Sequence, residues 1–191
     1  LFRSAHKAIK ANAKSIFNDP VSPVMGNKKG PVTLVEFFDY QCPHCRDDYP
    51  VIKKLMEKNP ELRIVLKEFP IFPHSKYAAL AALAAKEQGK YAAMHETLFA
   101  IPDPVTKTKV DNAADKLGID LAEMKKAMKS KKLVDELKSN MQLAEKIGIM
   151  GTPSFIIAKY DVKKDQLGDF YYLPSAASEK QLQKLINKAK K

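Results

Sequence analysis

The sequence predicts an α/β fold in which a block of helices is inserted into a layer of βαβ and ββα units. Residues 32–38, VTLVEFF, form a nearly continuous apolar run, as in strands buried on both faces. Residues 43–58 then take on helical periodicity, and residues 62–70 are typical of a second strand. The three elements make a βαβ unit with a right-handed crossover. Residues 75–147 show helical spacing almost throughout.

The end of the chain completes the layer. Residues 154–158, SFIIA, and residues 170–173, FYYL, are predicted to form two strands of a hairpin joined by a polar turn. Residues 178–191 are predicted to form a terminal helix, because Ser178 and Gln181 have the spacing of a capping box. The helices therefore interrupt one α/β domain, which an insertion at one sheet edge permits at little cost.

Composition excludes some classes of function. The 191 residues carry a formal charge of +11, but the lysines are scattered through helical segments and crowd mainly at the C-terminus. No RNP-like aromatic signature accompanies them, so we expect solvated lysine faces and no nucleic-acid partner. No stretch approaches the roughly 18 uninterrupted apolar residues of a membrane span.

The motif CPHC holds both cysteines of the chain, Cys42 and Cys45. The loop that they would close is too short to constrain the unfolded chain much, so a structural disulfide is a poor explanation. A zinc site would need a second pair of ligands, and the other histidines lack that spacing, so we expect no metal. A C-x-x-C sequence that opens a helix after a buried strand is instead a strong indication of redox chemistry.

The neighbours of Cys42 favour that interpretation. At the start of a helix, unpaired backbone N–H groups and the helix dipole would stabilise the Cys42 thiolate. Pro43 in the first turn sacrifices no hydrogen bond, and His44 can donate to the sulfur or place positive charge near it. Such surroundings lower a thiol pKa, which stabilises the reduced dithiol and makes the disulfide a strong oxidant.

Glu36 lies in the first strand, six residues before Cys42. Alternation places Glu36 on one face with Val32, Leu34 and Phe38, which predicts a buried carboxyl group. A buried acid near the dithiol could relay the proton of Cys45. The alternative is a glutamate at the strand end that reaches water.

The segments EFFDYQCPHC and GTPSF, with the helical insertion between them, resemble the DsbA-like thiol–disulfide oxidoreductases of the thioredoxin superfamily. The resemblance covers residues 24–190 and implies a thioredoxin fold. It implies a nucleophilic Cys42, a buried resolving Cys45 and an acid at Glu36. It also implies a cis peptide bond before Pro153, in a client-binding loop that the Gly151, Thr152 and Pro153 residues form.

The function that the resemblance implies is disulfide formation in unfolded or misfolded clients that contain cysteine, in a Gram-negative periplasm. The redox-active disulfide Cys42–Cys45 would be the reactive group, without another cofactor. A membrane partner of the DsbB or DsbD kind would reset it. DsbA-type oxidases often carry valine at the position of Thr152, whereas isomerases and reductases favour threonine there. A disulfide isomerase or reductase therefore stays an alternative, as does a holdase chaperone.

The N-terminal segment, residues 1–20, lies outside this resemblance; the DsbA-like domain would be residues 24–191, with its insertion at about 75–147. Residues 1–17 are predicted to form one amphipathic helix with a heptad seam made of Phe2, Ala5, Ile9, Asn12 and Ile16. We expect a homodimer joined through this helix, with isomerase character. The alternative is a helix packed on its own domain. Residues 21–31, VSPVMGNKKGP, are predicted to be a linker, because proline and glycine punctuate them. The chain begins at Leu1 without methionine, as in a processed or trimmed chain.

Overall fold

The computed structural model describes residues 2–191, with side chains from residue 4 onward. This part of the chain holds a five-stranded mixed sheet in the order β1-β3-β2-β4-β5. β2 and β3 are parallel, and the other neighbours are antiparallel. The strands are β1 (Val24–Gly26), β2 (Val32–Phe38), β3 (Leu62–Glu68), β4 (Ser154–Asp161) and β5 (Gln166–Leu173).

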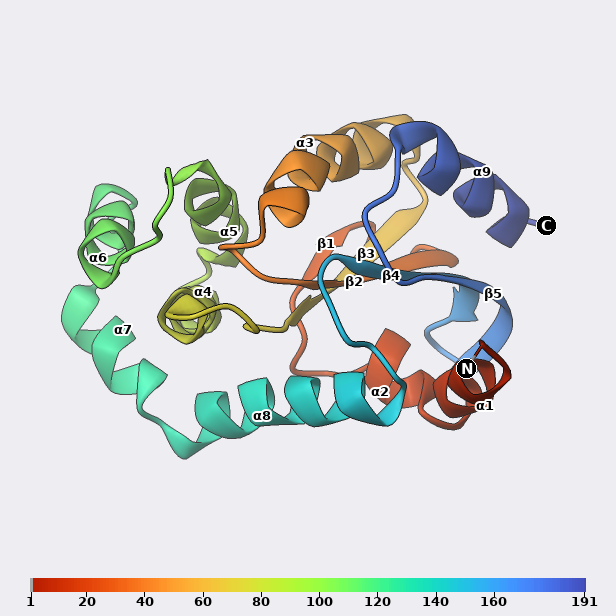
Figure 1. Ribbon diagram of the computed structural model, residues 1–191, viewed down its shortest axis with the longest axis horizontal. Coiled ribbons are helices and arrows are strands. Elements are labelled where there is room, and N and C mark those ends of the chain that lie inside the picture. Colours follow the sequence, from red (N-terminus) through yellow and green to blue (C-terminus); the bar gives the residue numbers. More distant parts are fainter. Residues whose placement is uncertain (1) are drawn as a thin grey trace.

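Helices cover both faces of the sheet (Figure 1). α3 and α9 lie over one face, α1, α2 and α8 lie over the other, and α4 to α7 extend beyond the side of the sheet. This is the thioredoxin-like α/β arrangement with a helical insertion that the sequence predicts. The helices are α1 (Phe2–Ala11), α2 (Ala13–Phe17), α3 (Pro43–Lys58), α4 (Ser75–Glu87), α5 (Tyr91–Ala100), α6 (Lys107–Lys116), α7 (Leu121–Met128), α8 (Lys131–Lys146) and α9 (Glu179–Ala189).

The central strand β2 divides the interior into two hydrophobic cores. All seven of its residues are buried. Leu34 and Phe38 join the core under α3 and α9, whereas Val35 and Phe37 join the core under α1, α2 and α8. Because successive side chains of a strand point to opposite faces, Glu36 belongs to the α3 side. The prediction of a strand buried on both faces is confirmed.

Two local predictions are wrong. Residues 24–26 lie in a stretch predicted to be a linker, yet they form β1, which pairs antiparallel with β3. A three-residue edge strand is too short to show a periodicity of its own. The polar turn of the terminal hairpin is also shorter than expected, because β4 extends to Asp161 and β5 begins at Gln166. These polar residues form ladder pairs at the exposed end of the hairpin, where alternation is no guide.

The N-terminal segment is not the single helix that we predicted. α1 and α2 meet at Asn12, whose side-chain amide donates to the Ala8 carbonyl at 2.7 Å, a side chain–backbone bond that competes with regular helix. Ile9 and Ile16 are fully buried in the chain's own core. The Phe2 side chain lies outside the described residues. The predicted seam therefore faces the sheet, so it lends no support to dimerisation.

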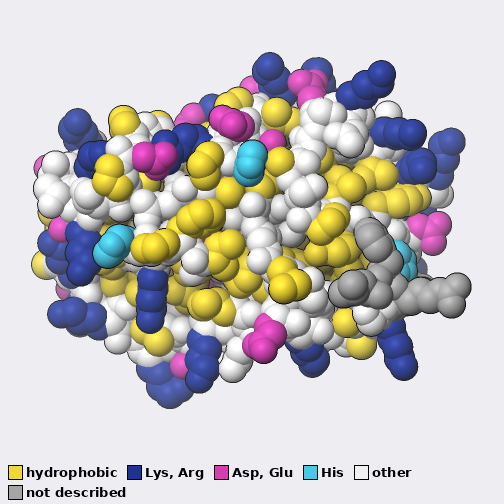
Figure 2. Space-filling model, viewed as in Figure 1, with side chains coloured by type: hydrophobic (Ala, Val, Ile, Leu, Met, Phe, Trp, Pro, Cys, Tyr) yellow, Lys and Arg dark blue, Asp and Glu magenta, His cyan; other side chains and the backbone are white. Residues whose placement is uncertain are grey.

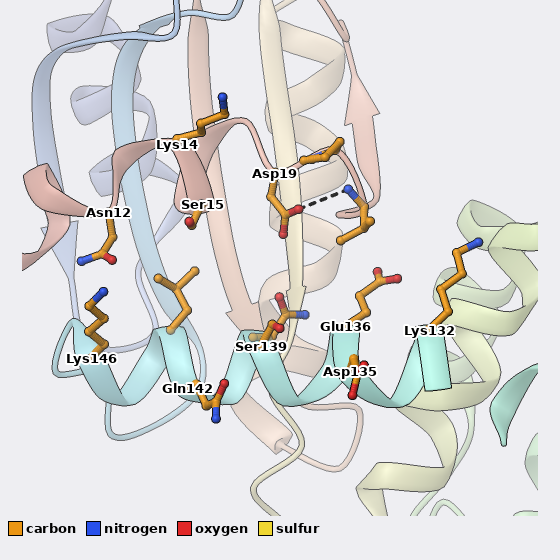
Figure 3. Close-up of a pocket in the computed structure, with 14 residues that line it drawn as sticks. Asn12, Lys14, Ser15, Asp19, Lys132, Asp135, Glu136, Ser139, Gln142 and Lys146 are labelled. Atoms are coloured by element: carbon orange, nitrogen blue, oxygen red, sulfur yellow. Dashed lines mark hydrogen bonds between the residues drawn. The ribbon is translucent and has the colours of Figure 1, made fainter. Parts of the chain in front are cut away.

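A pocket of about 630 Å³, lined mostly by polar and charged residues, lies on that same face, between the region of α2 and helix α8. In Figure 3, Asn12 and Ser15 line one side of this pocket, and Ser139 of α8 lines the other. Asp19, at its edge, accepts a hydrogen bond from the backbone N–H of Val21 at 3.2 Å. The sheet separates α2 and α8, between which this pocket lies, from α3, which begins at the cysteines (Figure 1).

The surface matches the scattered charge of the sequence. On the face shown in Figure 2, the described Lys and Arg side chains lie mostly around the rim, whereas hydrophobic side chains occupy much of the centre. Within residues 2–191, no helix has the length and apolar character needed to cross a bilayer.

Candidate active site

The two cysteines lie where the loop after β2 turns into α3. Cys42 is the N-cap residue, in an extended conformation, and Pro43 occupies the first turn without loss of a hydrogen bond. The Cys42 carbonyl accepts the N–H of Arg46 at 3.1 Å, which begins the helix. Both thiols are free and buried, with Cys42 2% exposed and Cys45 fully enclosed.

The pKa of Cys42 is lowered to about 5. The largest cause is a hydrogen bond from the Cys45 thiol, which stabilises the Cys42 thiolate. Burial acts in the opposite direction, and Thr152 and the backbone N–H groups of Cys45 and His44 lower the pKa further. At neutral pH Cys42 is therefore a thiolate, as its place at a helix start predicts.

Cys45 has the opposite character. Burial raises its pKa far above the ordinary value, and the hydrogen bond to Cys42 and the charge of Glu36 raise it further. The two thiols are thus strongly unequal acids, and Cys45 keeps its proton while Cys42 is ionised.

Pro43 and His44 are exposed at the start of α3. Within the described residues, no hydrogen bond joins the His44 imidazole to the Cys42 sulfur. His44 acts on that sulfur through its backbone N–H. The imidazole lies near enough to Asp48 to lower the pKa of that carboxyl group.

The loop before β4 closes the site from the other side of the chain. The Thr152–Pro153 bond is cis, as predicted. The Cys42 sulfur lies 3.2 Å from the Thr152 carbonyl oxygen, to which the protonated thiol donates, so this loop contacts the sulfur directly. The Thr152 hydroxyl oxygen is buried without a well-aligned hydrogen-bond partner. Next to it, the Gly151 carbonyl accepts the Ser154 hydroxyl at 2.9 Å.

Glu36 is 2% exposed, so the alternative that its carboxyl group reaches water is wrong. Its pKa is raised to about 8, first by burial and then by the negative charges of Asp48 and Cys42. Glu36 is therefore mostly protonated at pH 7. A protonated acid on the α3 side of the sheet is suited to exchanging a proton with Cys45.

Asp39 was missed by sequence reasoning, although it organises the cysteine loop. One carboxylate oxygen accepts the Gln41 N–H at 2.8 Å and the Ser75 hydroxyl at 2.6 Å. The other accepts the N–H groups of Ile71 and Phe72, at 2.8 and 2.9 Å. Asp39 thereby fixes the approach to Cys42 against the first turn of the insertion. The hydrogen bond from Gln41 to Asp39 is local and typical of a turn. The other partners of Asp39 lie more than thirty residues away along the chain, so the sequence gives no sign of them.

A buried polar network joins this loop to helix α5. The Tyr40 hydroxyl donates to Glu68 at 3.0 Å and lies 2.8 Å from His95 Nδ1, while the Tyr91 hydroxyl donates to Glu68 at 2.9 Å. With the Tyr40 proton directed to Glu68, His95 Nδ1 is the donor. Burial lowers the pKa of His95 to about 3, so its ring is neutral at pH 7.

Comparisons with known proteins agree with this fold. A profile of the family described as Thioredoxin matches residues 18–188. A thioredoxin-like oxidoreductase from Silicibacter pomeroyi has 38% identity and a TM-score of 0.83, covering 94% of this chain and 98% of its own. BcfH of Salmonella enterica Typhimurium has 28% identity and a TM-score of 0.83, covering 99% and 82%. The chain belongs to the thioredoxin family, and the prediction of a DsbA-like member of that superfamily is confirmed.

Curated relatives are longer than the region they share. The Na(+)/H(+) antiporter NhaA 3 of Salinispora tropica is 30% identical over 145 residues, which cover 72% of this chain and 22% of the antiporter. A Rickettsia typhi protein, RT0103, assigned by its name to the protein-disulfide oxidoreductases, is 29% identical over 147 residues, covering 70% and 53%. The chain therefore spans about a fifth of the first relative's length and about half of the second's.

Proposed function

We propose that this chain is a thiol–disulfide oxidoreductase that forms disulfides in client proteins through the Cys42–Cys45 pair. The observation that carries the proposal is the pair of thiols at the start of α3, hydrogen-bonded to each other, with the Cys42 pKa lowered and the Cys45 pKa raised. The family resemblance and the names of RT0103 and the Silicibacter protein support it.

The reaction consists of two exchanges. A client thiolate attacks the Cys42 sulfur of the Cys42–Cys45 disulfide, a new client–Cys42 bond forms, and Cys45 leaves as a thiolate that takes up a proton. A second client thiolate then attacks the client sulfur of the mixed disulfide. Cys42 leaves as a thiolate, and the client carries a new disulfide. The site holds two more electrons than before, and a partner must remove them.

The direction follows from the leaving group. A thiol of low pKa leaves readily, and a stabilised Cys42 thiolate favours the reduced form of the pair. The disulfide is therefore oxidising, which supports an oxidase rather than a reductase. Thr152 favours a second candidate, an isomerase, because its hydroxyl is buried beside the Cys42 sulfur, lowers the Cys42 pKa and has no well-aligned partner elsewhere.

Clients are proposed to bind in extended form along the Gly151–Pro153 loop, whose Thr152 carbonyl lies at the sulfur. An exposed apolar surface adjoins this loop. Met150, the residue before the loop, is 90% exposed and lines one pocket together with Ile71, which is 42% exposed. Such a surface suits unfolded or misfolded segments, which present apolar side chains of any sequence.

The proposed compartment is the Gram-negative periplasm, with the Cys42–Cys45 disulfide as the redox group. A similar structure is named a periplasmic thioredoxin-like protein from Salmonella enterica serovar Typhimurium, with 27% identity and a TM-score of 0.79. A membrane partner of the DsbB or DsbD kind would reset the pair. This partner, and a homodimer through residues 1–17, are proposals from the sequence.

The test uses an unfolded, reduced protein with several native disulfides as client. The oxidised chain should restore the client's activity at a rate that Cys42→Ala abolishes. Reduced Cys45→Ala should accumulate a mixed disulfide with the same client when the client carries scrambled disulfides, because its Cys42 thiolate attacks a client disulfide and no Cys45 thiol resolves the product. At equilibrium with glutathione, the Cys42–Cys45 pair should behave as a strong oxidant. If Cys42→Ala protects clients from aggregation as well as the native chain, and neither chain forms disulfides, the protein is a holdase and the proposal is wrong.

A further inference from the structure

A carboxyl group lies on the buried face of α3 where the helix would be expected to carry an apolar side chain. The buried residues of α3 follow the spacing of one helical stripe: Cys45, Asp48, Ile52 and Leu55. Of these four, Asp48 alone is charged, and it is 7% exposed. Since residues three apart are neighbours on a helix surface, Asp48 lies one turn from Cys45, on the same face.

The Asp48 side chain is incompletely satisfied by hydrogen bonds. It accepts the backbone N–H of Ala177, in the loop before α9. Its Oδ2 atom is buried and has no hydrogen-bond partner. Leucine at this stripe position would bury apolar surface, whereas a lone carboxylate oxygen loses its hydration. An unsatisfied buried group next to reactive thiols is a candidate for a chemical role.

The titratable groups around Asp48 come from β2 and from α3 itself. Glu36 faces it from β2, and the Asp48 charge is the second largest cause of the raised Glu36 pKa. Asp47, Cys42 and His44 act on Asp48 along α3. The loop before α9 contributes the Ala177 N–H. Two carboxyl groups therefore lie in one electrostatic environment beside the dithiol.

We propose that Asp48 is a second acid of the site, which shares with Glu36 the proton that Cys45 gains and loses. The inference rests on the proposed function. When a mixed disulfide at Cys42 is resolved from within, the Cys45 thiol passes its proton to this pair of carboxyl groups. The Cys45 thiolate attacks the Cys42 sulfur, the Cys42–Cys45 bond forms, and the other thiol leaves as a thiolate. In client oxidation the proton returns along the same path.

The charges of the pair suit this role. Burial raises the pKa of Asp48 to about 6, and the pKa of Glu36 is about 8. Coupled acids titrate as a pair, so at pH 7 the two groups together hold about one proton. One empty and one occupied position let the pair both accept a proton and donate one. Asp48, the more exposed of the two, offers the path to water.

The experiment follows two exchanges with a small probe, oxidised glutathione. The Cys42 thiolate of the reduced chain attacks the probe and releases one glutathione. Cys45 then resolves the mixed disulfide and releases a second. Asp48→Asn is expected to slow the second release about tenfold at pH 7, within the range of general-base effects. It should also remove the lower inflection of that rate against pH and change the first release less than about twofold.

The matched control is Asp47→Asn, the same change at the adjacent exposed residue, which should leave both releases within about twofold. Asp48→Leu places an apolar side chain on the buried face of α3. This variant should release the second glutathione as slowly as Asp48→Asn and should resist urea better than the unaltered chain. If Asp48→Asn matches Asp47→Asn in rate and pH profile, or if Asp48→Leu restores the rate, the inference is wrong. Failure of the proposed function is distinguishable, since the unaltered chain would then release no second glutathione.

Discussion

Buried charged side chains on the two faces of the sheet include one group with all its hydrogen bonds satisfied and two groups without. Under α1 and α2, the Lys67 ammonium group is fully enclosed and has three partners. It donates to the Ser15 carbonyl at 2.8 Å, the Asp19 carboxylate at 2.8 Å and the Ser22 hydroxyl at 2.7 Å. Under α3, in contrast, Asp48 has an oxygen without a partner, and Glu36 has no hydrogen bond within the described residues.

The difference separates a structural charge from a reactive one. An ammonium group has three donors, and Lys67 uses all of them, so its environment holds one state and one geometry. The carboxyl groups near Cys45 are under-satisfied, so small changes in neighbouring charge alter their protonation. Satisfaction of hydrogen bonds, rather than burial alone, distinguishes Lys67 from Glu36 and Asp48.

The largest expected effect comes from replacing Lys67, the buried charge whose hydrogen bonds are all satisfied. Lys67→Met keeps the apolar stem but leaves the Ser15 carbonyl, the Asp19 carboxylate and the Ser22 hydroxyl without their shared donor. We expect a loss of about 3–5 kcal/mol in the free energy of unfolding at pH 7, as for other broken buried pairs. Urea titration measures it. Lys14→Met, at a 75% exposed side chain, is the control and should cost less than about 0.5 kcal/mol. Equal losses would contradict the contrast.

The second effect tests the reactive side through pH. The folded-state pKa of Glu36, about 8, lies above its ordinary value of 4.5. Its protonated form therefore stabilises the fold fully below pH 4.5, and that contribution is lost as pH rises toward 8. Glu36→Gln should remove this loss and be more stable than the native chain by about 2–4 kcal/mol at pH 8.5. Glu57→Gln, on the exposed side of α3, controls for the lost charge. If the stability of Glu36→Gln depended on pH as that of the native chain does, the raised pKa assigned to Glu36 would be wrong.

A third measurement sharpens the comparison inside the site. Cys45→Ala removes the hydrogen bond that is the largest cause of the lowered Cys42 pKa. We expect that pKa to rise by about 1–2 units, as for the loss of a charge-assisted hydrogen bond. His44→Leu should raise it by less than about 0.5 unit, because the imidazole is exposed. The rate of Cys42 alkylation against pH gives both values. A larger rise in His44→Leu than in Cys45→Ala would reverse the assigned causes.

The smallest effect concerns the network that joins the cysteine loop to the insertion. Tyr40→Phe loses the hydrogen bonds to Glu68 and His95 and keeps the ring packing. We expect a loss of about 1–2 kcal/mol in unfolding free energy. Tyr171→Phe is the control, since its hydroxyl has no hydrogen bond among the described residues. Like Lys67, Tyr40 is a satisfied group, so its removal should alter stability more than the pH dependence of exchange.

The sequence alone determined the features with a local physical cause. Alternation in VTLVEFF placed Glu36 on a buried face of its strand, and a strand followed by C-x-x-C placed Cys42 at a helix start. The capping box of Ser178 and Gln181 is formed as predicted. Each depends on residues within a few positions of one another, so the pattern itself is sufficient.

Asp48 shows where local information was present but incomplete. Its spacing of three from Cys45 puts it on the buried stripe of α3, a signal that could have been found in the sequence. The unsatisfied Oδ2 atom of Asp48 could not have been predicted, because the loop before α9 supplies only one N–H group, that of Ala177, to this carboxyl group.

Only the tertiary structure decided the direction of the N-terminal helices, the pairing of β1 and the partners of Asp39. A stripe made of Ile9 and Ile16 is equally apolar whether it meets a second chain or its own sheet, and here it is buried on its own sheet. Asp39 collects donors from residues 71–75 because β2 and β3 end side by side. Periodicity tells which face of an element is buried, whereas the surface that covers it is set by the packing of the whole chain.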